Sequence, residues 1–227
     1  MLSIVIITKN EEKYLPVILN SFRKQSFHDY EIIISDNHSS DATLEIAKQS
    51  NCIITSGTNP SNCRNNGAGK AKGEIILFID ADMRIDDPNF LEIVNEKLRD
   101  NAVGAVCNVK IHPSEENVID ILLHFFLNTF IKFLLFIGVG TGRGGCQIVK
   151  QRYFDNYDEN ITVGEDVDLF KRLRKKGKIL FLNLIIYESK RRYNKLGYLK
   201  IIFEWIKSGI FNFILGNKYN KKRVEVR

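Results

Sequence analysis

Two aspartates close an apolar run in the sequence Gly73-Glu-Ile-Ile-Leu-Phe-Ile-Asp80-Ala-Asp82. Residues two apart in an extended chain share a face, so both carboxylates point to one side if extended geometry persists. Mg²⁺ and Mn²⁺ prefer hard oxygen ligands and are usually held by one or two carboxylates together with substrate phosphates. The pair therefore predicts a divalent-metal site that neutralises charge on a departing diphosphate. Because Asp-x-Asp is common, a turn or a helix cap is the alternative.

A second acidic cluster, Gly164-Glu165-Asp166-Val-Asp168, precedes a helix expected over Leu169 to Lys176. A carboxylate here fits a general base. When a group is transferred from a diphosphate with inversion of configuration, such a base takes the proton from the attacking hydroxyl. The alternative is that acids in the first turn stabilise the helix dipole. If the acceptor is instead a phosphate, its second pKa of about 6 leaves it largely ionised at neutral pH. Asp166 would then orient the acceptor or help hold the metal.

Short polar side chains follow the first two expected strands, in Thr8-Lys-Asn10-Glu11 and in Asp36-Asn-His-Ser39-Ser40-Asp41. Parallel strands end at the same edge of a sheet, so these groups predict the wall of a ligand pocket. The alternative is structural, because Thr8 with Glu11 fits a capping box and Ser40 fits a helix N-cap.

Alternating strand and helix signals must position these groups. Apolar, β-branched runs predict strands at Ser3–Ile7, Glu31–Ile34, Cys52–Thr55, Ile75–Ile79 and Val103–Val109. Helix-length segments lie between them at Glu11–Gln25, Asp41–Gln49 and Pro88–Arg99. Strands that are apolar on both faces belong to a covered, mostly parallel sheet. The order predicts an α/β layered domain with ligands at the carboxyl ends of its strands.

The second half of the chain contains an almost wholly apolar segment, residues 118–137, that is interrupted every fourth residue. The interrupting residues are Asp120, His124, Asn128 and Lys132. On a helix each step of four advances about 40°, so they form one stripe about 120° wide. Asp and Lys in hydrocarbon cost several kcal/mol, so we expect a helix lying in a membrane interface rather than a spanning one. A helix buried against the rest of the protein is the alternative.

The C-terminal segment repeats this pattern with Lys200, Glu204, Ser208 and Asn212. Trp205 and the basic tail after it suit a headgroup boundary. The 227-residue chain has a net charge of +6, and its cations cluster at Lys171–Lys178, Lys190–Lys195 and Lys218–Arg223. These clusters favour phosphate or lipid headgroups as partners, although solvated helix faces are the alternative. We expect no nucleic-acid partner.

The cysteines and the N-terminus bear on location. Four widely separated cysteines, with no C-x-x-C pair, predict neither a disulfide framework nor a zinc site. The first residues have no basic n-region and an apolar stretch of only strand length, so we expect no signal peptide. We therefore expect a cytoplasmic protein, peripheral on the inner face of the cell membrane.

Four stretches carry a family resemblance: SIVIITKNEEKYL, EIIISDNHSSDAT, NCRNNGAGKAKGEIILFIDAD, and GGCQIVKQRYF followed by GEDVDLFKRLRKKG. In order and spacing they resemble the family-2 glycosyltransferases of the GT-A fold, a group that includes dolichyl-phosphate mannose synthase and many polysaccharide-assembly enzymes. The resemblance implies a nucleotide-sugar donor and a Mn²⁺ or Mg²⁺ cofactor. Cys63 stands where the family usually has Ala, a difference that we expect to be tolerated.

The resemblance also implies residue roles. The nucleotide site would comprise Thr8, Asn10, Glu11, Asp36, Arg64, Asn65 and Asp80. The metal site would comprise Asp80 and Asp82, with Asp82 as the direct ligand. Asp166 corresponds to the catalytic base, and Gly144, Gly145 and Glu165 to the acceptor side. From their chemistry alone, Arg191 and Arg192 would bind an acceptor phosphate bidentately, with a surface charge run as the alternative.

Together these features predict a metal-dependent, inverting glycosyltransferase that moves a sugar from a UDP- or GDP-sugar to a polyprenyl phosphate or a lipid-linked glycan. No Gln-x-x-Arg-Trp motif follows, so we expect it to be non-processive. One alternative is a sugar-phosphate nucleotidyltransferase, which carries a glycine-rich loop where this chain has Thr8-Lys-Asn-Glu11. Another is a catalytically silent membrane or carbohydrate-binding module. We expect a GT-A domain over residues 1–195, followed by an amphipathic helix and basic tail over residues 196–227.

One motif is set aside. Residues 140–145 match G-x-G-x-x-G, but a dinucleotide fingerprint needs a strand before it and a helix after it. Here a helical stretch precedes the glycines and an extended one follows them. A lid over donor and acceptor is the interpretation that we prefer.

Overall fold

The structure is a computed structural model that describes residues 1–99 and 101–209. The strands are β1 (Leu2–Thr8), β2 (Tyr30–Asp36), β3 (Ile53–Ser56), β4 (Ile75–Asp80), β5 (Met83–Arg84), β6 (Ala102–Ile111), β7 (Cys146–Lys150) and β8 (Lys178–Glu188). The helices are α1 (Leu15–Arg23), α2 (Thr43–Gln49), α3 (Pro60–Ala68), α4 (Phe90–Lys97), α5 (Val118–Phe136), α6 (Glu165–Arg174), α7 (Arg191–Leu196) and α8 (Tyr198–Gly209). A short 3₁₀ helix, η1, covers Gln151–Tyr153.

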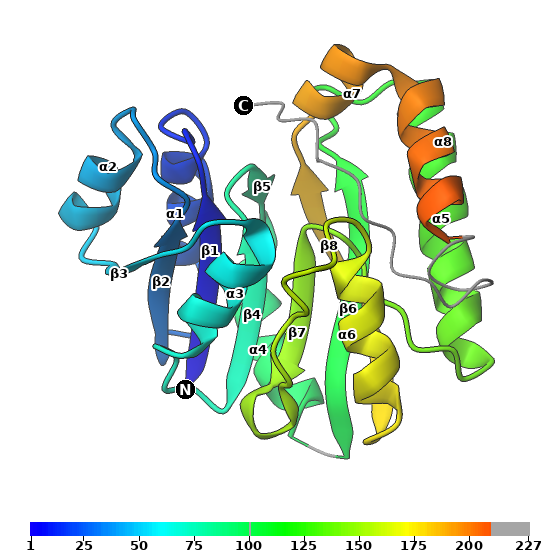
Figure 1. Cartoon of the computed structure of the whole chain (residues 1–227), viewed down its shortest axis with the longest axis horizontal. Helices are drawn as coiled ribbons and strands as arrows, with labels where there is room; N and C mark the ends of the chain where they lie inside the picture. Colours follow the sequence, from blue (N-terminus) through cyan, green and yellow to red (C-terminus); the bar gives the residue numbers. More distant parts are fainter. Residues whose placement is uncertain (100, 210–227) are drawn as a thin grey trace.

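Within the described residues the strands form one sheet in the order β3-β2-β1-β4-β7-β6-β8-β5 (Figure 1). The first four strands of that order are parallel, β7 runs antiparallel to both of its neighbours, and β6 and β8 are parallel again. The predicted mostly parallel α/β sheet is confirmed. The register places Thr8 opposite Asp36 and Ile7 opposite Asp80, so the polar strand ends reach one edge together.

Both faces of the sheet are covered, as the apolar strands predicted. Ile4 and Ile6 of β1 pack with α1, α2 and α4, whereas Val5 between them packs with α3 and α6. Residues of a strand alternate between faces, so a run without polar breaks is buried on both sides. Helices therefore fix the strand ends from two sides.

Several expected boundaries were wrong. The first helix begins at Leu15 rather than Glu11, and its N-cap is Tyr14, so Thr8 and Glu11 form no capping box. Ser40 is not an N-cap either, because α2 is preceded by Ala42 and the Asp41 side chain accepts from the Thr43 N–H. The loops after β1 and β2, which the sequence analysis assigned to helix starts, instead bond to each other.

The segment expected to be an interfacial helix is α5, and its polar stripe faces the protein. Asp120 is 1% exposed, accepts hydrogen bonds from Lys190 Nζ at 2.6 Å and Tyr198 Oη at 2.7 Å, and forms a capping box with Asn117. Burial opposes its charged form, but these hydrogen bonds lower the pKa of Asp120. The first turn of α5 is thereby fixed to α7 and α8.

The next two turns of α5 are held in the same way. Asn128 donates to Val109 O and accepts from Val109 N, while Nδ1 of His124 lies 3.0 Å from the same carbonyl oxygen. Burial lowers the pKa of His124, so its imidazole is neutral at pH 7. The polar stripe is therefore the packing surface of α5, and the apolar side is left outside. A surface helix of a soluble protein usually turns its apolar side to the core and its polar side to water, so α5 has the opposite orientation.

By length and composition α5 also qualifies as a candidate membrane span among the described residues, with a mean hydropathy of 1.8. Its hydrogen bonds to β6, α7 and α8 attach it to the sheet in this fold. The alternative of a helix packed against the protein is correct for its polar stripe and for Leu123, Ile131 and Leu135, which pack against buried clusters.

Helix α8 contributes the buried Ile201 to a small apolar cluster, against which Trp205 of α8 and Leu123 of α5 both pack. Leu199 and Phe203 remain exposed. Asn212 of the predicted second stripe and the tail cations Lys218–Arg223 lie outside the described residues. The division into residues 1–195 and 196–227 stays a prediction.

Replacing Asp120 by Ala should lower the free energy of unfolding by about 2 to 4 kcal/mol, because it removes the carboxylate partner of Lys190 and one of the two hydrogen bonds of the capping box of α5. Urea denaturation followed by circular dichroism measures the change. Asp29→Ala, which removes only an exposed contact with the N-terminus, is the matched control and should cost less than about 1 kcal/mol. Equal losses in the two variants would contradict the importance of the buried contacts.

Candidate active site

The ends of β1 and β2 form one wall of the site. Thr8 Oγ1 donates to Asp36 at 2.7 Å, and Ser39 donates to the same carboxylate from its backbone N–H and its hydroxyl. Asn10 adopts a positive φ of 54°, and its Oδ1 accepts from Ser40 N at 2.8 Å. The loops after the two strands are thus joined, and Asp36 is fixed by three hydrogen bonds at the sheet edge.

Arg191, at the start of α7, links this wall to the aspartate pair. Its Nη1 and Nη2 atoms donate to Glu11 at 2.8 and 2.7 Å, and Nη2 lies 2.9 Å from Asp82 Oδ2. Burial raises the pKa of Asp82 to about 6, although Arg191 opposes the shift. Arg191 therefore contacts site carboxylates, and the alternative of a surface charge run is wrong for this residue.

A second arginine holds the other side of the site. Arg64 of α3 is 2% exposed, donates to Asp80 Oδ1 and to Glu165 Oε1 at 3.0 Å each, and lies over the ring of Tyr157. Burial alone lowers the pKa of a guanidinium, but the two carboxylates raise the pKa of Arg64. It therefore stays charged and joins three elements, α3, β4 and α6.

Asp80 and Asp82 remain suited to a metal ion. The chain turns after β4 rather than staying extended, yet the two carboxylates are close enough for Asp80 to raise the pKa of Asp82. Both side chains are partly exposed at the sheet edge. Among residues 1–99 and 101–209, no cluster of three or more His, Cys, Asp or Glu side chains is suited to hold a metal by itself. The site therefore fits an ion held by one or two carboxylates and completed by ligand phosphates.

The glycine-rich loop between α5 and β7 lies against this pair. A Cβ atom on Gly142 would come within 2.8 Å of the Asp166 Cβ, and one on Gly145, whose φ is +84°, would meet Met83 Cε. The Asp80 N–H donates to Gly145 O at 3.0 Å. Gly145 therefore lies beside Asp80, and Asp166 contacts the same glycine loop. The acceptor role of Gly145 and the catalytic role of Asp166 stay predictions. No helix follows the glycines, which confirms that they are not a dinucleotide fingerprint.

Three of the expected residues lie less centrally. The Asn65 side chain bonds with the backbone of Tyr157 and the carboxylate of Glu159, so it anchors a loop to α3. Arg192 is exposed on α7. A Cβ on Gly144 would meet no atom within 4 Å, so this residue borders open space. Their nucleotide and acceptor roles stay predictions.

Sequence reasoning missed Glu188 and Arg143. Glu188 ends β8, pairs in register with Met83, accepts from Tyr193 Oη at 2.6 Å and raises the pKa of Asp82. The apolar run before it was a strand signal that was overlooked. Arg143 is buried in the glycine loop with Nη2 3.3 Å from His124 Nδ1. The sequence signal that could have identified Arg143 is its position as a cation between glycines.

Comparisons with known proteins agree with this geometry. A family model described as Glycosyl transferase family 2 matches residues 3–158. The poly(ribitol-phosphate) beta-N-acetylglucosaminyltransferase TarS of Staphylococcus aureus is 33% identical over 90 residues, 35% of this chain and 16% of TarS. The GalNAc(5)-diNAcBac-PP-undecaprenol beta-1,3-glucosyltransferase of Campylobacter jejuni is 33% identical over 92 residues, 36% of this chain and 29% of the relative. The aligned segments thus span less than a third of either relative.

Solved structures share the fold. A TarS fragment in complex with UDP aligns with a TM-score of 0.65 at 18% identity, covering 95% of this chain and 73% of that one. The mannosyltransferase PcManGT from Pyrobaculum calidifontis, in complex with GDP-Man and Mn²⁺, aligns with a TM-score of 0.68 at 13% identity, covering 91% and 64%. These likenesses confirm the expected GT-A architecture.

Replacing Arg64 by Met should lower the free energy of unfolding by about 3 to 5 kcal/mol, because two carboxylates lose their buried cation. Chemical denaturation at pH 7 measures the effect. Arg84→Met, which removes an exposed arginine that pairs with Asp86, should cost less than about 1 kcal/mol. A variant at Arg64 as stable as that control would show that the guanidinium does not hold the site together.

Proposed function

The chain belongs to glycosyl transferase family 2, and on that premise we propose that it transfers a sugar from a UDP- or GDP-sugar to a membrane-associated acceptor. The observation that carries the proposal is the position of Asp80 at the sheet edge, beside the Thr8–Asp36 pair and joined through Arg64 to the start of α6, which carries Asp166. In this proposal Asp36 binds the nucleoside, Asp80 and Asp82 bind the metal ion, and Asp166 acts as the base, all within one site.

The donor would lie along the ends of β1, β2 and β4. Thr8, Asn10 and Glu11 line this edge, and Asp36 would accept hydrogen bonds from the base, with Arg64 and Asn65 supporting the nucleotide from α3. The fixed orientation of Asp36 supports this role, because three donors hold it in place. Preorganised acceptors bind a planar base without first losing conformational freedom.

Asp82, with Asp80 beside it, would hold Mn²⁺ or Mg²⁺ together with the donor diphosphate. When bound, the ion supplies charge neutralisation for the departing nucleoside diphosphate. The name of the Pyrobaculum mannosyltransferase structure, which includes Mn²⁺, supports the choice of metal.

Asp166 would act on the acceptor. In an inverting transfer the acceptor oxygen bonds to the anomeric carbon as the bond to the diphosphate breaks, and Asp166 takes the hydroxyl proton. Gly144, Gly145 and Glu165 would line the acceptor side. Arg191 and Arg192 would contact an acceptor phosphate, in which case Asp166 orients the acceptor instead.

The acceptor class is supported by the names of relatives, which include an undecaprenol-linked glycan and a poly(ribitol-phosphate). We propose a polyprenyl phosphate or lipid-linked glycan acceptor, and a cytoplasmic enzyme peripheral on the inner face of the membrane. The absence of Gln-x-x-Arg-Trp from the sequence supports a non-processive reaction.

Asp82→Asn should reduce Mn²⁺-dependent release of nucleoside diphosphate at least about 100-fold, since a lost metal contact removes charge stabilisation of the leaving group. The assay pairs a panel of UDP- and GDP-sugars with a polyprenyl phosphate. Asp86→Asn, a carboxylate that contacts Arg84 at the surface, is the control and should retain activity. Full activity in Asp82→Asn would remove the metal role from this residue.

Asp166→Asn separates the two acceptor hypotheses. With a hydroxyl acceptor kcat should fall by about 10² to 10⁴, the range for a lost general base, while donor affinity is kept. With an ionised phosphate acceptor the fall should be less than about tenfold, because no proton has to leave. Asp168→Asn, on the same helix and paired with Arg172, is the matched control. An unchanged kcat with every acceptor would exclude both roles.

A further inference from the structure

Helices α5 and α8 expose a large apolar surface, which we call the apolar face. Its principal residues are Phe126, Phe130 and Phe133 of α5 and Leu199, Phe203 and Ile206 of α8, each between 54% and 86% exposed. The two helices overlap in the view of Figure 1, and Tyr198 at the start of α8 joins them because its hydroxyl donates to Asp120 of α5. Soluble monomers rarely expose large apolar patches, so this number of exposed large apolar side chains on two linked helices indicates a surface that binds a partner.

The exposure is built into the fold. Turning α5 to bury its phenylalanines would separate Asp120 from Lys190 and Asn128 from Val109, leaving buried polar groups without partners. Each such loss costs about 1 to 3 kcal/mol, and more for a charge. The polar interior contacts therefore hold the apolar side of α5 outward.

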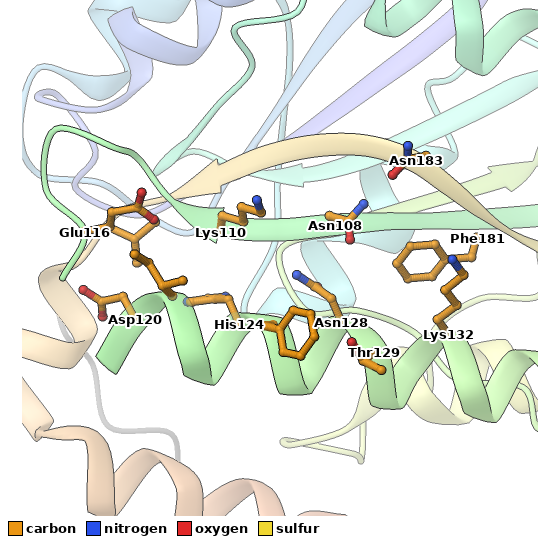
Figure 2. Close-up of a pocket in the computed structure, with 13 residues that line it drawn as sticks. Asn108, Lys110, Glu116, Asp120, His124, Asn128, Thr129, Lys132, Phe181 and Asn183 are labelled. Carbon is orange, nitrogen blue, oxygen red and sulfur yellow. The ribbon is translucent and has the colours of Figure 1, made fainter. Parts of the chain in front are cut away.

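Cations border the apolar face on both edges. A groove of about 350 Å³ lies between α5 and the strands β6 and β8, lined by Phe125 at the edge of the face and by Lys110 and Lys132 (Figure 2). Lys132 lies over the Phe181 ring at 5.9 Å. On the α8 side the exposed Lys200 follows Leu199 directly. Ammonium groups around an apolar surface match the phosphates that surround the acyl layer of a bilayer.

We propose that the apolar face docks on the surface of an anionic lipid bilayer, with α5 and α8 in the plane of the interface and the flanking lysines on headgroup phosphates. A second copy of the chain is disfavoured, since a twofold interface repeats the same cationic edges on both sides of the contact. The net charge of +6 adds to that repulsion. The proposal deepens and rests on the proposed membrane-associated acceptor, but it involves none of the transfer chemistry.

The test is co-sedimentation of the full chain with vesicles of phosphatidylcholine containing 30% phosphatidylglycerol, in the absence of donor and metal. The wild-type chain should bind these vesicles and bind pure phosphatidylcholine more weakly. The double variant Phe126→Gln, Phe130→Gln should lose affinity at least about tenfold, because two buried rings leave the interface. Val17→Gln replaces an exposed apolar residue of α1 and should bind like the wild type.

A second variant tests the cationic edge. Lys132→Gln, Lys200→Gln should lower binding to the anionic vesicles about 30-fold, at about 1 kcal/mol per cation, and leave the weak binding to phosphatidylcholine unchanged. No vesicle binding by the wild-type chain, or equal binding by the phenylalanine variant, would overturn the proposal. So would a wild-type dimer in sedimentation equilibrium that the phenylalanine variant abolishes without any lipid effect. Sugar transfer to a short soluble acceptor is assayed separately. Transfer without vesicle binding would contradict only the docking proposal, and vesicle binding without transfer would contradict only the proposed function.

Discussion

Two arginines make this site possible. The carboxyl edge of the parallel strands gathers carboxylates from β4, α6 and the loop after β1, and these groups repel one another in a partly buried setting. Arg64 neutralises Asp80 and Glu165, and Arg191 neutralises Glu11 and Asp82. Each guanidinium contacts carboxylates from different elements. The same ion pairs therefore neutralise the charges and hold the elements together.

The same pairing leaves Asp82 with fewer contacts to Arg191 than Glu11 has. One nitrogen of Arg191 contacts Asp82, whereas two nitrogens donate to Glu11 and the guanidinium also lies over the Tyr14 ring. Arg191 would therefore keep its position without Asp82. Burial and the neighbouring Glu188 favour the protonated form of Asp82, and a divalent ion would favour the charged form. In the proposed function, binding of the ion would therefore be coupled to loss of that proton.

Adjacent residues connect the site with the apolar face. Lys190 binds Asp120 of α5, and the next residue, Arg191, binds Glu11 and Asp82. One turn of chain therefore anchors both the helix that carries the apolar face and the carboxylates at the strand ends.

The sequence by itself determined the sheet, its two covered faces and the carboxylates at its edge, because apolar periodicity and polar strand ends are local signals. It did not reveal α3, the final strand β8 or the partners of Arg64 and Arg191, since these depend on residues distant in the chain that meet only in the fold. The sequence shows polar residues at every fourth position of α5, and this spacing predicts one polar stripe on the helix. Which way the stripe points was decided by tertiary structure, because Val109, Lys190 and Tyr198 supply polar partners that a sequence pattern does not contain.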